Sequence, residues 1–289
     1  MHLLWRDLRD TSEARLGEAG VPDPARELRW IVERAAGWSP ADLVAALDEP
    51  ATARQVRSVD EMVARRVAGE PLQYVLGRWG FRTLDLLIDR RVLIPRPETE
   101  VVAGLAIDVV AARPGPAVAV DLGTGSGAIA LAIAAECWPH VEVWATDRSA
   151  EALAVARANL AGLGRRASVV RVARGSWYEA LPDDVRGRVD VVVSNPPYVA
   201  EGDVLPEEVT AWEPLDALLA GPEGLDDLTV LVDGAPAWLA PGGSLVLEIG
   251  ATQAEAVSAL ARDAGLVDVS VHQDLAGRDR AVVARRSEG

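Results

Sequence analysis

From residue 117 onward, short apolar segments alternate with helical ones, and this alternation restricts the fold more than any other feature. Seven segments are predicted strands, at residues 117–122, 141–146, 168–172, 189–194, 244–249, 266–272 and 281–284. Four predicted helices lie among them, at residues 127–137, 149–161, 224–239 and 252–264. Alternation of this kind predicts an α/β fold with a mostly parallel sheet covered on both faces. A short polar loop joins the last two strands, so we expect that pair to be antiparallel.

The first 70 residues have a helical pattern. Asp23-Pro24 and Ser39-Pro40 each combine an N-cap residue with a proline suited to the first helical position. Apolar residues repeat at helical spacing in two places, at Leu28, Ile31, Val32 and Ala35, and at Val56, Val59, Val63 and Val67. We therefore expect a small helical bundle over residues 1–70. It is either a stabilising extension or a docking module for a macromolecular partner.

Residues 71–97 are predicted to form a hairpin-like linker. Glycines and prolines interrupt this segment, and its apolar residues Leu84, Leu86 and Ile88 alternate as in a strand. A helix is expected to follow Pro95-Arg96-Pro97. The acids at its start favour the positive end of the helix dipole, and a second interpretation places Arg96 near an active cleft.

Composition limits the location and the partners of the chain. No apolar run reaches the roughly 18 residues of a membrane span, and the charged N-terminus is unlike a signal peptide, which indicates a cytoplasmic protein that binds no membrane. One Cys and three scattered His provide neither a disulfide nor a metal site. The net charge is −15, and residues 117–289 hold 26 acids against 13 arginines. This balance makes direct nucleic-acid binding unfavourable.

The segment from Asp121 to Gly127 joins the first predicted strand to a helix. Its glycines permit a tight turn and close approach of a ligand to the backbone. The Gly-x-Gly-x-Gly spacing differs from the dinucleotide fingerprint and from a Walker loop, since the chain has no Lys. Asp147 ends the second strand and is expected at the same edge of the sheet as this segment. There it either accepts the hydroxyls of a ribose or caps the next helix. Together these residues predict an adenosine-containing cofactor.

Asn195-Pro196-Pro197-Tyr198 follows the fourth strand and is therefore expected at this same edge. The two prolines fix the local backbone, so the segment is suited to aim an amide. We interpret it as a binding site for a planar NH2 group, either a side-chain amide or the exocyclic amine of a base. Combined with the glycine loop, it resembles the class I S-adenosylmethionine-dependent methyltransferases that act on such nitrogens.

Further segments narrow this resemblance to the HemK/PrmC family, the peptide chain release factor glutamine N5-methyltransferases. The segments are Glu70 to Tyr74 with Gly77, Leu93 to Glu100, Glu248 to Gly250 with Gln253, and Gly277 to Arg280. The resemblance begins near residue 70 and implies a doubly wound methyltransferase domain over residues 98–289. A sister family, which methylates a glutamine of a ribosomal protein, usually carries Pro-Arg-Ser in place of Pro95-Arg96-Pro97, so a release factor is favoured. A methyltransferase for nucleic-acid amino groups and a scaffold without activity are the competing functions.

The resemblance also implies roles for single residues. The methionyl part of S-adenosylmethionine would be bound by Gly123, Thr124, Gly125, Ser126 and Gly127. Asp147 would hold the ribose, and Trp177 would lie by the adenine unless it is plain core; Ser176 stands where many relatives have an acid. The substrate glutamine would be held by Asn195, Pro196, Pro197 and Tyr198. Asn195, Pro196 and Tyr198 would take part in catalysis, and Asn195 would also bind the cofactor. The acidic stretch 201–227 would face a basic loop of the release factor, or be a solvated loop.

Overall fold

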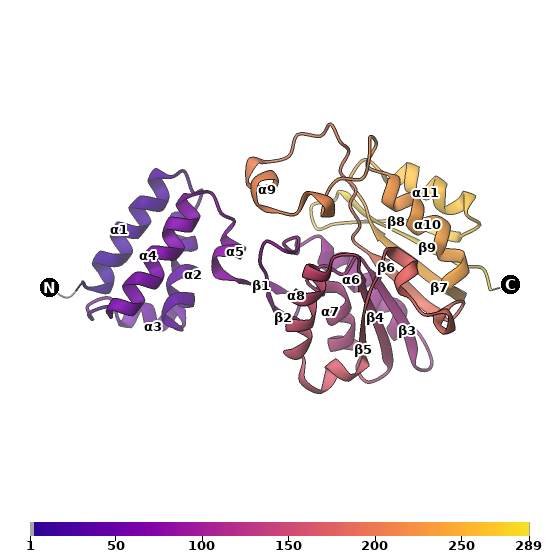
Figure 1. Cartoon of the computed structure of the whole chain (residues 1–289), viewed down its shortest axis with the longest axis horizontal. Helices are drawn as coiled ribbons and strands as arrows, with labels where there is room; N and C mark the ends of the chain where they lie inside the picture. Colours follow the sequence, from indigo (N-terminus) through magenta and orange to yellow (C-terminus); the bar gives the residue numbers. More distant parts are fainter. Residues whose placement is uncertain (1–2, 289) are drawn as a thin grey trace. The chain divides into compact units, whose positions relative to one another are not determined.

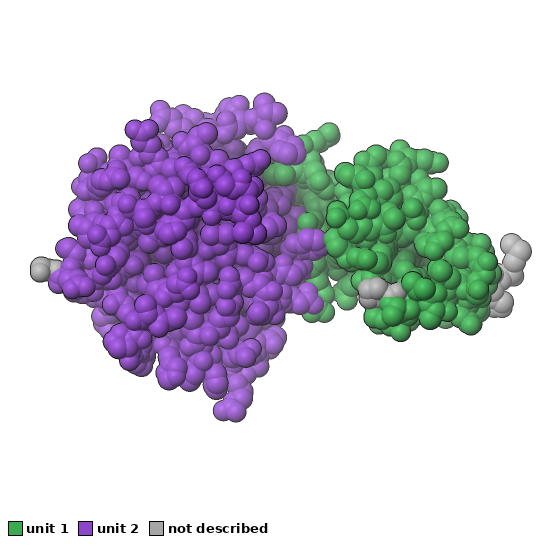
Figure 2. All heavy atoms as spheres, turned by 180° about the vertical axis from the view of Figure 1, so that it is seen from behind, with its two compact units in different colours: residues 1–78, 207–212 green, residues 79–206, 213–289 purple. Residues whose placement is uncertain are grey.

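The computed structural model describes residues 3–288, which form two compact units (Figures 1 and 2). The first unit contains the chain up to residue 78 together with residues 207–212, and the second contains the remainder. A short piece of chain that follows the fourth strand of the sheet in sequence therefore belongs to the N-terminal unit.

The first unit is built mainly of helices, with one isolated β-bridge between Leu4 and Pro50. Its helices are α1 (Trp5–Glu18), α2 (Pro24–Ala36), α3 (Pro40–Ala45), α4 (Ala53–Val67), α5 (Leu72–Leu76) and α9 (Glu207–Trp212). Asp23 caps α2 and Ser39 caps α3, as their positions before proline predicted. Val59 and Val63 are buried, but Val67 is 41% exposed, so the apolar stripe of α4 stops one turn earlier than expected. The helix α5 was not predicted.

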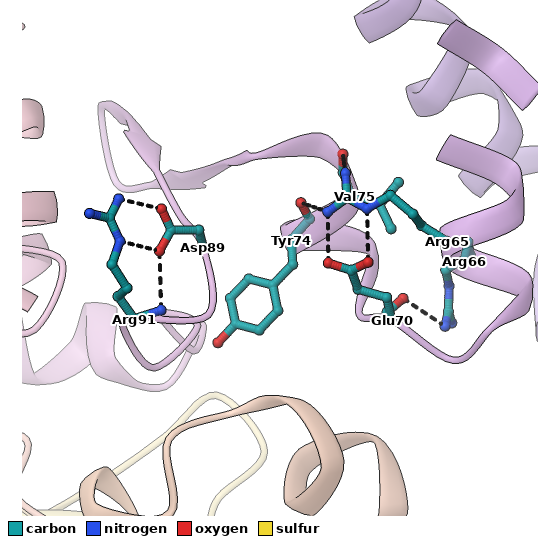
Figure 3. A network of polar contacts seen from close by, with 7 residues as sticks. All are labelled: Arg65, Arg66, Glu70, Tyr74, Val75, Asp89 and Arg91. Atoms are coloured by element: carbon teal, nitrogen blue, oxygen red, sulfur yellow. Dashed lines mark hydrogen bonds and ion pairs between the residues drawn. The ribbon is translucent and has the colours of Figure 1, made fainter. Parts of the chain in front are cut away.

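A charged network fixes the turn between α4 and α5 (Figure 3). The buried carboxylate of Glu70 receives two hydrogen bonds from Arg65, at 2.7 and 2.8 Å, and Arg65 also donates to the carbonyls of Tyr74 and Val75. Arg66 pairs with Glu27 at 2.7 Å and with Glu208 of α9 at 3.1 Å. A buried carboxylate is costly unless it is paired, so these contacts hold the turn in one conformation.

The predicted hairpin is present as β1 (Arg78–Phe81) and β2 (Leu84–Leu87). After β2, Asp89 and Arg91 are joined by an ion pair that closes the next turn (Figure 3). The backbone of Leu87 exchanges two hydrogen bonds with the side chain of Asn159, which also donates to the carbonyl of Ser126 at 2.9 Å. This amide therefore fastens the hairpin to the glycine loop.

The second unit is built on a seven-stranded sheet in the order β5-β4-β3-β6-β7-β9-β8. The strands are β3 (Ala117–Leu122), β4 (Val141–Asp147), β5 (Val170–Arg174), β6 (Val189–Ser194), β7 (Leu239–Glu248), β8 (Val267–Gln273) and β9 (Asp279–Arg285). The first five are parallel, and β9 pairs antiparallel with both β7 and β8, which confirms the predicted fold class. β7 begins at Leu239 instead of residue 244, because the strand continues through Pro241-Gly242-Gly243 with a register irregularity against β6.

Helices cover both faces of this sheet (Figure 1). One group is α6 (Thr99–Ala111), α7 (Ala128–Cys137) and α8 (Ala150–Ala161); the other is α10 (Asp226–Trp238) and α11 (Ala254–Asp263). Val120 and Leu122 of β3 share a core with Leu228 of α10 and Val257 of α11. Asp121 lies between Val120 and Leu122 in β3. Because successive side chains of a strand alternate, the Asp121 side chain points to the opposite face of the sheet. Short 3₁₀ helices lie at Gly164–Val169, Trp177–Ala180, Asp183–Val185 and Leu215–Ala217.

The order of the strands creates a crevice at the carboxyl end of β3. The chain leaves β3 toward β4 on one side, whereas β6 lies on its other side. Ligands of open α/β sheets bind at such a switch point. Across residues 3–288, no helix combines the length and the apolar character that a membrane crossing requires.

Candidate active site

A cavity of about 270 Å³ opens at this switch point, beyond the carboxyl ends of β3, β4 and β6. Eight residues that the sequence singled out line it: Gly123, Thr124, Gly125, Ser126, Asp147, Trp177, Asn195 and Pro197. Three other candidates, Gly127, Pro196 and Tyr198, lie beside lining residues in the chain without lining the cavity themselves. The predicted site residues are thus brought together by the ends of neighbouring strands.

The glycine loop has a backbone that other residues rarely adopt. Gly123, Gly125 and Gly127 have φ angles of 74°, 55° and 87°, in the left-handed region that glycine enters without steric cost. The Thr124 amide donates to the Thr146 carbonyl of β4, and within the loop the Gly127 amide donates to the Thr124 carbonyl, both at 2.8 Å. These hydrogen bonds hold the loop, and Gly123 and Gly125 line the cavity.

Asp121 ties this loop to the start of α7. Its Oδ2 accepts from the Thr124 hydroxyl at 2.6 Å and from the Ala130 amide at 3.1 Å. Burial raises the pKa of Asp121 to about 7, although these two donors lower it. Its other oxygen, Oδ1, is buried and has no hydrogen-bond partner among residues 3–288. Since Asp121 also lines the cavity, it is an unsatisfied acceptor at the place where a cationic or hydroxylated ligand would lie.

Asp147 ends β4 and supports the other side of the loop. Its Oδ2 accepts from the Gly125 amide at 2.9 Å and its Oδ1 from the Ser149 amide at 2.8 Å. Ser149, not Asp147, caps α8, because its hydroxyl accepts from the Ala152 amide. Burial raises the pKa of Asp147 above its ordinary value, and the two backbone donors oppose that shift. Each oxygen keeps a further lone pair for a ligand in the cavity.

Trp177 begins the 3₁₀ helix after β5 with a left-handed φ of 45°. A Cβ placed on Gly123 would lie 3.2 Å from its ring, so the indole covers that glycine closely. The ring also packs against the hydrophobic core of the sheet. Trp177 therefore both lines the cavity and belongs to the core, and the two interpretations of this residue are compatible; Ser176 lines the cavity beside it.

The segment after β6 is anchored at both ends. The Ser194 hydroxyl donates to the Leu122 carbonyl at 2.6 Å, and Nδ2 of Asn195 donates to the Thr99 hydroxyl at 3.3 Å. The Tyr198 hydroxyl donates to Oε1 of Glu248 at 3.2 Å, and its carbonyl accepts from Nε2 of Gln253 at 2.9 Å. These contacts, together with the two prolines, give the segment a single conformation.

Glu248 ends β7 directly behind this segment and is 1% exposed. Burial raises its pKa to about 7, against the lowering effects of Thr99, Arg280 and Tyr198. Burial and the nearby Glu248 in turn raise the pKa of Tyr198 above its ordinary value. Oε2 of Glu248 is buried and lacks a hydrogen-bond partner in the described part of the chain.

Sequence reasoning assigned no role to Thr99 or Glu248, although both stand in segments that carried the family resemblance. Thr99 lines the cavity, and besides that resemblance its only sequence signal is its position at the start of a helix. Arg96 does not line the cavity, but its neighbour Pro95 does, and Arg96 pairs with the buried Glu213. Glu213 also accepts from the Ile94 amide at 3.0 Å, so this pair holds the cavity wall.

Known proteins resemble both units. Residues 7–77 match the family model of the PrmC N-terminal domain, and residues 106–212 match that of the methyltransferase small domain. Proteins named release factor glutamine methyltransferase are 43% identical in Cereibacter sphaeroides (94% of each chain covered) and 44% identical in Bordetella pertussis (92% of this chain and 95% of the relative). A third, from Xylella fastidiosa, is 47% identical over 82% of this chain and 84% of its own.

Among solved structures, a methyltransferase from Pyrococcus furiosus has the same fold. Its TM-score is 0.51 at 19% identity, over 79% of this chain and 99% of that one. The close relatives cover nearly the full length of both chains, and the two family models divide the chain in the same order as its helical and sheet-containing parts. The chain belongs to the release factor glutamine methyltransferase family.

Proposed function

We infer that this chain transfers a methyl group from S-adenosylmethionine to the side-chain amide nitrogen N5 of the glutamine in the Gly-Gly-Gln loop of class I peptide chain release factors. One observation carries this inference: Asn195 and Pro197 line the same cavity as the glycine loop and Asp147. One site thus combines residues suited to bind an amide with residues suited to bind an adenosine-containing cofactor. The relatives named release factor glutamine methyltransferase support the choice of substrate.

The residues present fit S-adenosylmethionine. The unsatisfied Oδ1 of Asp121 suits its methionyl ammonium, and the backbone of the glycine loop at Gly125, where an added Cβ would meet no neighbour, suits its carboxylate. The Asp147 carboxylate suits the two ribose hydroxyls, and the Trp177 ring offers an apolar surface for adenine. When bound, the cofactor supplies an electrophilic methyl group on a sulfonium.

The work of the chain itself is to orient a weak nucleophile. The lone pair of an amide nitrogen is delocalised into its carbonyl, so the nitrogen must be held in the reactive geometry. We propose that Oδ1 of Asn195 and the Pro196 carbonyl each accept one N–H of the substrate amide, while Tyr198 packs on its flat face. Acceptors fixed in advance favour the positive charge that develops on the nitrogen. Orientation of bound reactants contributes as much as ~7–11 kcal/mol in model reactions.

No strong base is required in this scheme. Once nitrogen has gained the methyl group, its N–H is strongly acidic, and the proton passes to water. The nearest buried acids, Asp121 and Glu248, are occupied in holding the loop and Tyr198. The proposed reaction therefore depends on the two acceptors, Oδ1 of Asn195 and the Pro196 carbonyl, and on the exclusion of other orientations of the substrate amide.

The partner is proposed to be a protein with a basic loop, met in the cytoplasm during translation. Residues 201–227 contain nine acids and no Arg, a charge pattern that would attract such a loop. If this attraction guides binding, kcat/KM for the intact release factor should fall steeply as salt rises from 50 to about 500 mM. A rate that does not respond to salt would exclude this guidance and leave the chemistry untouched.

Mass spectrometry of a release-factor peptide tests the function directly. Incubation with the protein and S-adenosylmethionine should add one methyl group to the loop glutamine and none to a matched peptide with asparagine in its place. Labelled cofactor offered with DNA, RNA or ribosomal protein serves as the comparison. Transfer to one of these instead of the release factor would refute the proposed substrate. If the methyl group is transferred neither to the release factor nor to any of these, the proposed enzyme activity is refuted.

A further inference from the structure

We propose that Gln253 is a positioning residue that fixes Tyr198 for its contact with the substrate amide. This inference rests on the proposed function, because only there does Tyr198 pack on the flat face of a glutamine amide. Gln253 does not line the cavity and is assigned no step in the chemistry. It acts through Tyr198, whose backbone it contacts by a hydrogen bond.

The side chain of Gln253 joins three separate stretches of backbone. Its Nε2 donates to the Tyr198 carbonyl at 2.9 Å and to the Gly224 carbonyl at 3.1 Å. Its Oε1 accepts from the Gly250 amide at 2.9 Å. A backbone carbonyl can only accept and a backbone amide can only donate, so these partners determine which end of the side-chain amide carries the oxygen. The reversed amide would lose all three hydrogen bonds.

Two glycines make room for this amide. A Cβ added to Gly224 would lie 3.0 Å from Nε2 of Gln253 and 2.3 Å from the Tyr198 carbonyl, and one added to Gly250 would lie 3.0 Å from Oε1. The base of the side chain is also held in place. Gln253 directly precedes α11, and Val257 in the first turns of that helix belongs to the core of the sheet. The amide is therefore in close contact with its partners and is attached to a packed helix.

Gln253 also joins the two ends of residues 199–223, because Tyr198 precedes this stretch and Gly224 follows it. The ends are paired by backbone hydrogen bonds as well, such as that from the Val199 amide to the carbonyl of residue 218 at 2.9 Å. Gln253 adds the hydrogen bond that holds the Tyr198 carbonyl itself. The hydroxyl at the other end of Tyr198 is bound to Glu248. The ring of Tyr198 is thus fixed from both its backbone and its tip.

The part of residues 199–223 that lines the cavity has a separate attachment. Pro214 lines the cavity, and Glu213 beside it accepts from the Ile94 amide at 3.0 Å. Loss of the Gln253 amide should therefore displace Tyr198 and leave the cofactor part of the cavity in place. This separation allows positioning of the substrate to be distinguished from support of the whole site.

The test compares Q253A and Q253E with the control Q273E. Alanine removes the side-chain amide. Glutamate keeps an acceptor for the Gly250 amide, but when ionised it has no donor and sets its charge against two carbonyl oxygens. Q273E makes the same chemical change at an exposed position of β8, where the amide donates to Asp279 at 3.1 Å. The kcat and KM for the release-factor peptide are measured at about pH 6 and about pH 8, with the Kd of S-adenosylhomocysteine and the thermal midpoint.

At the higher pH, we expect Q253A and Q253E to lower kcat about 10- to 100-fold, as misplacement of an orienting group would, with Kd changed less than threefold. Two carbonyls and partial burial raise the pKa of the introduced carboxyl, so lowering the pH protonates it and restores one donor. The kcat of Q253E, taken as a ratio to the wild type at each pH, should then rise more than threefold. The same ratio for Q253A should stay constant, and Q273E should remain within threefold of the wild type throughout.

Other outcomes overturn the inference. Wild-type kcat in Q253A would show that Gln253 does not position Tyr198, while the proposed function stands. A loss of cofactor affinity parallel to the loss of kcat would assign Gln253 to the support of the whole site. A ratio for Q253E that does not respond to pH would exclude its hydrogen bonds as the cause. Should Q253E fail to fold, the comparison of kcat with Kd in Q253A decides. Absence of methyl transfer by the wild type would refute the proposed function itself.

Discussion

Replacement of Asp147 by asparagine should weaken cofactor binding by a predictable amount. Each carboxylate oxygen already accepts one backbone N–H, from Gly125 at 2.9 Å and from Ser149 at 2.8 Å, and each is proposed to accept a ribose hydroxyl. Asparagine turns one oxygen into an NH2 donor, which removes one charge-assisted bond to the cofactor and also leaves the Gly125 or the Ser149 amide without its acceptor. Hydrogen bonds to charged groups contribute about 1.5–3 kcal/mol. The Kd for S-adenosylhomocysteine should therefore rise about 10- to 150-fold.

The pH dependence provides a second measurement of the same interaction. Burial raises the pKa of Asp147 above its ordinary value, and the proposed binding mode needs the ionised form. As pH falls toward that raised pKa, protonation competes with the cofactor, so the Kd of the wild-type protein should rise. D147N cannot ionise at this position and should show a flatter profile. Calorimetric titrations between pH 5 and about 8 would reveal the difference.

Asp216 supplies the matched control. D216N removes the same charge near the same cavity, but the Asp216 side chain is 66% exposed and is paired only at 3.5 Å with Arg148. Exposed pairs of this kind contribute little, so D216N should change Kd less than threefold. Equal effects of D147N and D216N would mean that general charge, and not a specific contact, governs binding. An unchanged Kd in D147N would refute the assignment of Asp147 to the cofactor.

Three further predictions concern the segment Asn195 to Tyr198 and the residues that support it. N195A should lower kcat about 10²- to 10³-fold and leave the Kd of S-adenosylhomocysteine within threefold; a parallel loss of both would make Asn195 a cofactor ligand first. G224A and G265A both force a side chain onto a left-handed backbone, but only at Gly224 would the new Cβ meet a neighbour, the Tyr198 carbonyl at 2.3 Å. Thermal unfolding should show G224A less stable than G265A by about 1–3 kcal/mol, and equal midpoints would count against a rigid backbone at Tyr198. For Glu248, burial raises the folded pKa to about 7 from an ordinary 4.5, so the native state retains a proton that the unfolded chain releases and stability falls as pH rises between those values. E248Q should remove the part of this decline that Glu248 causes, while Asp121, whose pKa burial also raises to about 7, keeps its own part, and should exceed the wild type at pH 8 by on the order of 3 kcal/mol; denaturant titrations with the same decline in both proteins would contradict the shift.

Much of the fold and the site could be predicted because strand ends and functional residues coincide in this chain. β3 and β6 have the predicted bounds, since each apolar run stops where a segment of the candidate site begins. The parallel arrangement then brings the glycine loop, Asp147, Trp177 and Asn195 to one edge without further information. The capping of α2 and α3 was equally predictable, because those contacts span three residues.

The remaining features depend on contacts that no local pattern contains. Thr99 and Asn195 are 96 residues apart in the chain, and Tyr198 and Glu248 are 50 apart. A threonine at the start of a helix is most simply interpreted as a cap, and a glutamate at the end of a strand as solvent-exposed. Similarly, Pro241-Gly242-Gly243 has the composition of a turn, yet pairing with β6 on either side of it, at Leu239 and Ser244, keeps it within β7. Tertiary contacts override local preference at each of these positions.

Helix α9 has a consequence for experiments that shorten the chain. Because residues 207–212 belong to the helical unit while their neighbours on both sides belong to the other, the chain passes between the units three times. Deletion of residues 1–78 would remove Arg66, the ion-pair partner of Glu208, and would leave α9 without the unit of which it is part. The disturbed segment begins nine residues after Tyr198. Loss of activity in a truncated enzyme would thus report on the ordering of residues 207–212 as well as on any part that residues 1–78 have in recognising the substrate.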